Sequence, residues 1–318
     1  MEPAALQSFG FLTLPNYSMI ACANALEALR MANRLIGRED YSWRIITLDG
    51  QAVAASNGLT LQPTVSLAQA GAFDAVFVCG GVDVRHATGR PLIAALRHLA
   101  VGRTALGALC TGSFALAEAG LLGRRRCAIH WENLSAIREE FPDIDFVEDL
   151  YAIDGDRLTC TGGVAPLDMM THLIAARHGR DVARRVSAQF IVERDRAGAE
   201  RQPASTHLRA AKGHPQLEAA VRMLEGDPAS PKSPSEVAAA VRLSSRQLER
   251  LFVRHLGQTP AAFSSGLRLE RARVLLGQTA MSVTDVAVAC GFSSPAHFST
   301  AFRRRFGHAP SVRRGQDG

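Results

Sequence analysis

The most constraining feature of this sequence is a change of pattern near residue 195. Before that point, apolar runs of strand length alternate with segments of helical periodicity; after it, only helical periodicity remains. Alternating strands and helices are typical of an open, mostly parallel sheet with helices on both faces. The sequence therefore predicts an α/β domain of the doubly wound, flavodoxin-like type, followed by an all-α domain.

The expected elements can be placed by residue range. Strands are expected at 8–14, 43–48, 75–81, 104–109, 150–153 and 158–161, with a hairpin signal at Asn57-Gly58 inside 53–61. Helices are expected at 18–33, 91–101, 113–119, 132–140, 166–178 and 181–193, and then at 215–226, 234–241, 245–256, 260–277, 282–290 and 295–306. A polar stretch rich in small residues separates the two sets. The predicted boundaries are 1–195, a linker at 196–214, and 215–318.

The excess positive charge lies in the second domain. Residues 1–211 carry 21 Lys and Arg against 22 Asp and Glu, whereas residues 212–318 carry 15 against 8. A basic domain beside a nearly neutral one indicates contact with a polyanion, most often nucleic acid. A generally basic proteome would produce the same excess, so the sequence motifs must distinguish nucleic-acid binding from a merely basic composition.

Composition excludes several other classes of protein. The chain contains no run of about 18 apolar residues, so no membrane span is predicted. The amino terminus has an acid at Glu2 and no basic region, unlike a secretory signal. The six cysteines form no CxxC pair and have no nearby His cluster, so we expect neither a metal site nor another cofactor. Such scattered cysteines suit a protein of the reducing cytoplasm.

Residues 233–257 have the pattern of a helix-turn-helix. Ser233 with Glu236, and Ser244 with Gln247, have the spacing of capping boxes on either side of a short turn. The second helix places an apolar stripe on one side and charged residues on the other. The stripe comprises Leu248, Leu251, Phe252 and Leu256, and the charged side comprises Arg246, Glu249, Arg250 and Arg254.

Residues 282–307 repeat this plan about 48 residues further on. Ser282 and Asp285 have capping-box spacing, Gly291 supplies the turn, and Ser294-Pro295 opens the next helix. Phe298, Phe302 and Phe306 recur every four residues as a buried stripe. A plain helical bundle would explain one copy as well, but two copies in the basic domain favour DNA binding.

The stretches SSRQLERLFVRHLGQTP and GFSSPAHFSTAFRRRFGHAP resemble the two signature regions of the AraC family of bacterial transcription regulators. The resemblance covers about 100 residues; one departure is Val312, where the family usually has an aromatic residue. It implies two recognition helices that enter successive major-groove segments. The matching positions that would face DNA are Arg246, Glu249, Arg250 and Arg254 in the first helix, and Pro295, Ala296, Ser299, Thr300, Arg303 and Arg304 in the second.

Side-chain chemistry ranks the two helices. Arg246 and Arg250 can bond guanine in bidentate fashion, and Glu249 can accept from cytosine. The second helix offers hydroxyls and small apolar groups, with Arg303–Arg305 placed for phosphates. We therefore expect the first half-site to be read more stringently.

In the first domain, Cys110 lies between an expected strand and an expected helix. Its small neighbours Ala108 and Gly112 suit the strained turn of a nucleophile elbow, where the helix amino terminus would favour a thiolate. Together with His130 and Glu27, Cys110 could form a hydrolase site or a vestigial one. A small buried cysteine is an equally good reading of the residues alone.

The segments GGVDVR, ALCTGSFALAEAGLLGRRRCAIHW and TCTGGVAPLDMMTHLIAARHG resemble a PfpI-type, class I glutamine amidotransferase-like domain, in the version fused ahead of AraC-type domains. This resemblance covers roughly residues 8–195. It implies an effector-sensing and dimerisation unit without catalysis. The nearest-looking members control catabolism of arginine, carnitine or glycine betaine.

A pocket above the carboxyl ends of the strands would then hold a zwitterionic effector. Backbone N–H groups at Cys110, Thr111 and Gly112 would bind a carboxylate, Glu27 a cationic nitrogen, and Trp131 or Tyr17 would add an aromatic face. His130 is as readily a core histidine as a donor to the ligand, and both aromatic residues are common core residues.

The sequence thus predicts a DNA-binding transcription regulator, an activator, that responds to a small nitrogenous metabolite such as an amino acid or quaternary amine. Its expected partners are promoter half-sites in double-stranded DNA, RNA polymerase, the effector and a second copy of the chain bound through the first domain. Two alternatives remain: a PfpI-type cysteine enzyme fused to a DNA-binding domain, and a redox sensor based on Cys110.

Overall fold

The structure is a computed structural model that describes residues 3–62, 65–192, 196–200, 202, 207, 210–211, 213–226, 232–278 and 281–315. Its contacts divide the chain into two compact units, Met1–Gln202 and Pro203–Gly318. The first unit is α/β and the second is helical throughout its described residues, as the sequence predicts.

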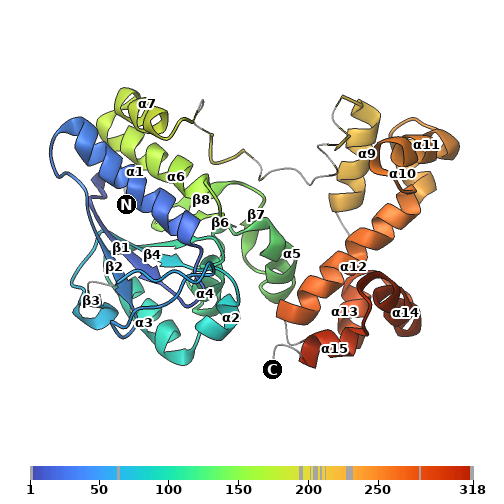
Figure 1. Ribbon diagram of the computed structural model, residues 1–318, viewed down its shortest axis with the longest axis horizontal. Helices are drawn as coiled ribbons and strands as arrows, with labels where there is room; N and C mark the ends of the chain where they lie inside the picture. The colour runs from blue at the N-terminus through green and yellow to red at the C-terminus, as the bar shows by residue number, and fades with distance from the viewer. Residues whose placement is uncertain are drawn as a thin grey trace. The chain divides into compact units, whose positions relative to one another are not determined.

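A seven-stranded sheet forms the centre of the first unit (Figure 1). The strands follow the order β3-β2-β1-β4-β5-β9-β8 and are parallel except for the antiparallel β9–β8 pair at one edge. The order of the five central parallel strands is that of the flavodoxin-like fold, which confirms the predicted fold class. The strands are β1 (Ser8–Thr13), β2 (Ser42–Thr47), β3 (Val65–Ser66), β4 (Ala75–Cys79), β5 (Ala105–Leu109), β8 (Tyr151–Asp154) and β9 (Arg157–Cys160).

Helices cover both faces of this sheet (Figure 1). Helices α1, α6 and α7 pack on one face, and α2 to α5 pack on the other. Their bounds are α1 (Met19–Ile36), α2 (Val84–Ala87), α3 (Arg90–Val101), α4 (Ser113–Glu118), α5 (Trp131–Glu140), α6 (Ala165–His178) and α7 (Arg180–Gln189). Two further strands, β6 (Arg126–Ala128) and β7 (Asp145–Val147), form a separate parallel pair.

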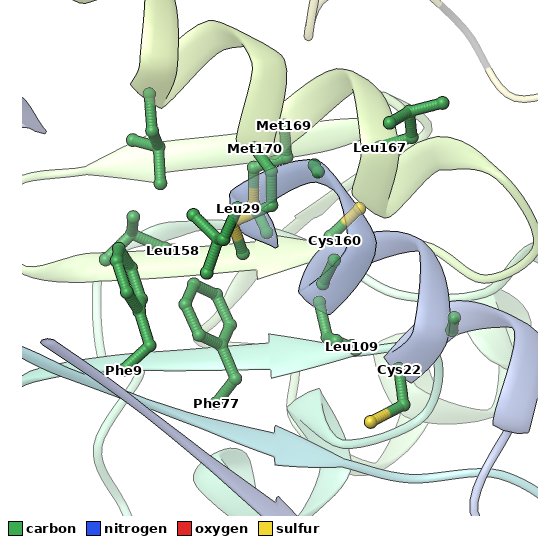
Figure 2. Close-up of a cluster of buried hydrophobic side chains, with 14 of the residues drawn as sticks. Phe9, Cys22, Leu29, Phe77, Leu109, Leu158, Cys160, Leu167, Met169 and Met170 are labelled. Atoms are coloured by element: carbon green, nitrogen blue, oxygen red, sulfur yellow. The ribbon is translucent and has the colours of Figure 1, made fainter. Parts of the chain in front are cut away.

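The central strands explain why the sheet is covered on both faces. Every residue of β4 and β5 is buried, as expected for continuous apolar runs inside a parallel sheet. Figure 2 shows Phe9 and Phe77 rising from the sheet toward Leu29 of α1 and Met170 of α6. A Cβ atom at Gly107 would lie only 2.2 Å from the Phe77 ring, so a glycine is required there.

The short elements were missed by the sequence patterns. Strands β3, β6 and β7 have two or three residues each, too few to display a period. The hairpin signal is confirmed as one antiparallel bridge between Ala54 and Thr60, with Gly58 in the left-handed region. Helix α7 ends at Gln189; residue 193, the predicted end, lies outside the described residues.

The first part of the predicted linker packs on the first unit. The Arg196 guanidinium lies 2.6 Å from the Asp168 carboxylate, and the Gly198 carbonyl accepts from the backbone N–H of Leu150, the residue before β8, at 3.0 Å. The Gln202 side chain donates to the Ile129 carbonyl at 2.9 Å. The two units divide after Gln202, inside the predicted linker 196–214.

The second unit contains two similar helix pairs joined by the long helix α12 (Figure 1). Six of its helices agree with the predicted ranges to within a residue, whereas α15 was not predicted. The helices are α9 (Pro215–Gly226), α10 (Pro234–Ala240), α11 (Ser245–Leu256), α12 (Pro260–Gln278), α13 (Val283–Ala289), α14 (Pro295–Phe306) and α15 (Pro310–Gly315).

Aromatic side chains form the cores of the two pairs. Phe252 of α11 meets Phe263 of α12 edge-on, with ring centroids 5.4 Å apart. In the second pair, Phe298 and Phe302 of α14 are fully buried and 5.6 Å apart, and Phe292 lies 5.1 Å from Phe298. The apolar stripes predicted from the sequence therefore face the cores.

Candidate functional site

Side-chain caps define where the helices of both pairs begin. The Ser244 hydroxyl accepts the Gln247 backbone N–H at 3.3 Å, and the Gln247 side chain accepts the Ser244 N–H in return. Equivalent capping boxes open α10 at Ser233 and α13 at Ser282, and the Ser294 hydroxyl caps α14. All four predicted caps are confirmed, so both pairs are helix-turn-helix motifs.

The outward face of α11 is charged and exposed. Arg246, Glu249, Arg250 and Arg254 are all exposed, whereas Leu248 and Phe252 on the opposite side are buried. Among the described residues, none of the four forms an ion pair. Three guanidiniums and one carboxylate are thus available to a DNA groove. Val253, half exposed on the same face, was not singled out in the sequence.

The outward face of α14 is smaller and less charged. Pro295, Ala296, Thr300, Arg303 and Arg304 are exposed, and Ser299 is half-buried. The Thr300 hydroxyl donates to the Ala296 carbonyl at 3.0 Å, which leaves its oxygen as an acceptor. Arg305 differs from the prediction, because its guanidinium lies 3.2 Å from the Glu270 carboxylate of α12.

In the first unit, Cys110 occupies the turn between β5 and α4. Its φ of 60° is left-handed, a strained conformation for a residue with a side chain, as expected of an elbow. A Cβ atom at Gly112 would lie 2.0 Å from the Val78 carbonyl oxygen, so only glycine fits there. The predicted elbow geometry is present.

His130 is the neighbour of Cys110 that the sequence suggested. Its backbone N–H donates to the Cys110 carbonyl at 3.3 Å. The side chains also converge: a Cβ atom at Gly162 would lie 3.1 Å from the Cys110 Sγ and 2.8 Å from the His130 Cδ2. Gly162, which the sequence analysis did not select, therefore makes room for both; the Gly162-Gly163 pair after β9 was the available signal.

Burial disfavours the charged form of both side chains. Burial raises the pKa of the Cys110 thiol to about 11, although hydrogen bonds from Thr111 and Ser18 act in the opposite direction. Burial also lowers the pKa of His130, outweighing the nearby Glu132 carboxylate. Burial of Cys110 thus disfavours the thiolate that the sequence led us to expect, because desolvation outweighs the hydrogen bonds from Thr111 and Ser18.

The other elbow residues are engaged within the fold. The Gly112 backbone N–H donates to the Leu109 carbonyl at 3.0 Å. The Thr111 hydroxyl donates to the Gly81 carbonyl at 2.7 Å. Both bonds hold the turn in shape, and the first occupies one of the backbone N–H groups that were expected to bind a carboxylate.

The polar groups of Glu27 and Tyr17 have partners within the fold. The Glu27 carboxylate pairs with Arg30 on the same helix, at 2.6 Å. Tyr17 is fully buried, and its hydroxyl meets the Met19 sulfur at 3.7 Å; burial raises its pKa to about 12. Tyr17 is thus a core residue, which was one of its two readings.

Trp131 has the opposite environment, with 58% of its surface exposed. Its ring lies 5.6 Å from that of His130. Glu132 follows it, with a carboxylate oxygen 3.8 Å from the His130 Nδ1. Sequence reasoning found Trp131 and missed Glu132, although the two are adjacent in the chain.

Known protein families match both units of the chain. Residues 19–176 match the DJ-1/PfpI family, and residues 237–316 match a helix-turn-helix domain. The HTH-type transcriptional regulator GbdR of Pseudomonas aeruginosa is 44% identical over 98% of this chain and 85% of its own length. The chain belongs to the AraC-type regulators that carry a DJ-1/PfpI domain.

Two further relatives support this membership. The HTH-type transcriptional regulator CdhR of Pseudomonas aeruginosa is 40% identical over 96% of this chain and 90% of its own length. The crystal structure of an AraC family transcriptional regulator from Pseudomonas putida covers 58% of this chain and 99% of that chain, with 28% identity and a TM-score of 0.53. This AraC-type protein is a DNA-binding transcription regulator.

The described residues contain no helix long and apolar enough to cross a membrane. Within the same residues, no group of three or more His, Cys, Asp or Glu side chains is arranged to hold a metal ion. A shallow depression of about 590 Å³, lined by Arg103, Arg125 and Asp156 among others, lies at the amino ends of β5 and β9. It is at the opposite edge of the sheet from Cys110.

Proposed function

We propose that this regulator senses a small nitrogenous metabolite, such as an amino acid or quaternary amine, through a first unit that does not catalyse a reaction. The observation that carries the proposal is the Cys110–His130 pair at the carboxyl ends of the strands, in which the thiol is buried, the imidazole is half-buried, and burial disfavours the charged form of each. A cysteine nucleophile needs a thiolate or a base that can generate one. A pair in which burial disfavours both ions suits the floor of a binding site.

The DNA contacts follow from the two outward faces. Arg246, Glu249 and Arg250 of α11 would read bases in the first half-site, while Arg254 binds phosphate. On α14, the small and hydroxyl groups at Pro295, Ala296, Ser299 and Thr300 would face bases, and Arg303 and Arg304 would bind phosphates. The first half-site is then the more stringently read.

Effector binding would act on a homodimer held by the first unit. Paired helix-turn-helix motifs read direct half-sites as a monomer, so a second copy must be recruited by another surface. The protein would act in the cytoplasm as an activator that contacts RNA polymerase at the promoter. Sedimentation of the full chain tests the dimer, which the proposal requires without DNA.

A thermal-shift panel on the full chain tests the sensing function. Amino acids, betaines, carnitine and polyamines are compared with neutral sugars; a ligand at 100 times its dissociation constant should add about 2.7 kcal/mol, a shift of a few degrees. A response to nitrogenous compounds alone supports the proposal. A response to sugars alone, or a glyoxalase or peptidase activity lost in Cys110→Ser, contradicts it.

A further inference from the structure

The last residues of the first unit, 196–200 and 202, lie inside the predicted linker but are fixed on the domain; we call them the strap. The backbone N–H and the guanidinium of Arg196 donate to the Asp168 carboxylate, which is buried in the first turn of α6. Gln202 is only 8% exposed, although most glutamines in proteins are exposed. A buried amide destabilises the fold unless it is hydrogen-bonded, so its partners define where the strap is fixed.

The Gln202 amide reaches the Cys110–His130 pair through one peptide group. The Gln202 Nε2 donates to the Ile129 carbonyl at 2.9 Å, and this carbonyl belongs to the same peptide group as the His130 N–H. That N–H donates to the Cys110 carbonyl at 3.3 Å. Because a peptide group is planar and rigid, it cannot tilt at one end without moving the other. One rigid group therefore joins the strap to the Cys110 turn.

A second chain of hydrogen bonds joins the strap to the other side of the pair. The Gly198 carbonyl accepts the Leu150 N–H at 3.0 Å, and the Leu150 carbonyl accepts the Thr161 N–H at 2.9 Å. Thr161 precedes Gly162, where a Cβ atom would come within 3.1 Å of the thiol sulfur and 2.8 Å of the imidazole. The strap is thus bonded to both segments that border the pair.

The strap continues after a few residues into the second unit. Only residues 203–206 lie between Gln202 and His207 in the sequence, and His207 belongs to the second unit. The His207 imidazole meets the Phe263 ring edge-on, with centroids 4.7 Å apart, and its Nδ1 lies 3.3 Å from the Glu225 carboxylate. A change at Gln202 is therefore separated from the helix-turn-helix unit by a short piece of chain.

We propose that Gln202 is a positioning residue that couples the Cys110–His130 pair to DNA binding. A ligand that turns the Ile129–His130 peptide alters the hydrogen bond to Gln202, and the strap passes between the docked form of this structure and a released form. Effector and DNA then change each other's affinity by the same factor, because both bias the same two forms. This inference rests on the proposed sensing function and supplies its connection to the recognition helices.

A double-mutant cycle on the full chain tests the coupling without any ligand. His130→Ala removes the imidazole of the pair, and Gln202→Met removes the hydrogen bond to the Ile129 carbonyl while keeping the length of the side chain. Affinity is measured for DNA that the parent chain selects from a randomised pool. Each substitution alone should change this affinity about fivefold or more, in the same direction. In the Gln202→Met chain, His130→Ala should have no further effect.

The cycle separates coupling from a purely structural role. If Gln202 only stabilised the fold, Gln202→Met would lower the melting temperature but leave the effect of His130→Ala on DNA affinity unchanged. Equal effects of His130→Ala in both backgrounds overturn the proposal. The proposal is also overturned if either single substitution leaves the DNA affinity of the parent chain unchanged.

Gly198→Ala perturbs the strap by a different means and leaves the Gln202 amide in place. A Cβ atom at Gly198 would lie 2.7 Å from the Tyr151 ring, so alanine does not fit without movement of the strap or the ring. This variant should change DNA affinity in the same direction as Gln202→Met. Gln189→Met, at an exposed position of α7, is the matched control and should bind DNA as the parent chain does. DNA binding by Gly198→Ala that equals the control would contradict a role for the strap.

Failure of the coupling and failure of the sensing function give different results. If a compound of the nitrogenous panel binds the parent chain and changes DNA affinity equally in Gln202→Met, the coupling is overturned and the sensing function stands. If no compound of the panel binds the parent chain, the sensing function fails. The double-mutant cycle uses no ligand, so it still decides whether Gln202 couples the pair to DNA binding.

Discussion

The two helix-turn-helix motifs share one backbone plan and differ in almost everything placed on it. Both begin with a serine capping box, and both turns pass through a left-handed residue, Arg242 in the first and Gly291 in the second. A preceding helix bonds a carbonyl of each turn: Gln216 to Val241 at 3.3 Å, and Arg268 to Gly291 at 3.0 Å. The comparison teaches that the caps and the apolar stripes specify the motif. The turn residue, the side chain that hydrogen-bonds the turn, and the outward face vary.

The largest expected effect on stability comes from substitutions in the cores of the two motifs. Phe302→Ala in the second motif should lower the free energy of unfolding by about 3–5 kcal/mol, and Leu248→Ala in the first by about 2–5 kcal/mol, because both side chains are fully buried. Denaturant unfolding of the full chain measures both. A loss below about 1 kcal/mol for Phe302→Ala would mean that α14 does not depend on its aromatic stripe.

The outward faces provide the next contrast. Arg250→Ala should lose about 1–3 kcal/mol of discrimination at one position of the first half-site, because a bidentate contact to guanine disappears. Ser299→Ala should change second half-site selectivity much less, and exposed Arg222 on α9 supplies a control for lost charge. Selection of bound sequences from a randomised pool measures the selectivity at each half-site. A sharper preference at the second half-site would mean that α14, and not α11, is the more selective helix.

The hydrogen bonds that hold the two turns should differ in strength. Arg268→Met removes a charged donor from the Gly291 carbonyl and should cost about 1–2 kcal/mol, while Gln216→Leu removes a neutral donor and should cost about 0.5–1 kcal/mol. Arg268 also lies over the Phe292 ring, at 4.7 Å, and methionine retains that packing. Footprinting of Arg268→Met should show weaker protection of the second half-site only. Equal weakening at both half-sites would contradict the idea that each turn is held by its own side chain.

Exchanging the turn residues sharpens the comparison further. Arg242→Gly should stabilise the first motif, and Gly291→Ala should destabilise the second, each by about 1 kcal/mol, because only glycine adopts the left-handed region without strain. Thermal unfolding of the two variants should therefore shift in opposite directions. Shifts of the same sign would show that side-chain contacts outweigh backbone strain.

The smallest difference is a dependence on pH. Desolvation, with the nearby His214 and Arg254 charges, lowers the pKa of His255, whose ring lies 4.1 Å from that of His214. A base with a lowered pKa in the folded state stabilises it above the unfolded pKa of about 6.5 and loses this contribution as pH falls. The melting temperature should therefore drop between pH 7 and 5, and less steeply in His255→Gln. An unchanged slope in the variant would exclude His255 as the source.

Local signals explain which parts of the fold could be predicted. The caps at Ser244 and Ser282 and the buried runs of β4 and β5 depend on residues within one turn or strand, so the sequence predicts them well. The sequence did not reveal that Arg196 and Gln202, inside the predicted linker, are held by Asp168 and Ile129, because these partners lie far away in the chain. Strand β6 was missed because its three residues are too few to display a period.

The sequence by itself determined the two fold classes, the two helix-turn-helix motifs and the Cys110 elbow, because each follows from the order and period of neighbouring residues. Only the tertiary structure decided that Tyr17 is buried, that Glu27 pairs with Arg30, and that Trp131 and Glu132 are exposed beside His130. It also decided that the thiolate of Cys110 is disfavoured, since burial is a property of the surrounding segments. Exposure and protonation depend on contacts between distant residues, which no local pattern encodes.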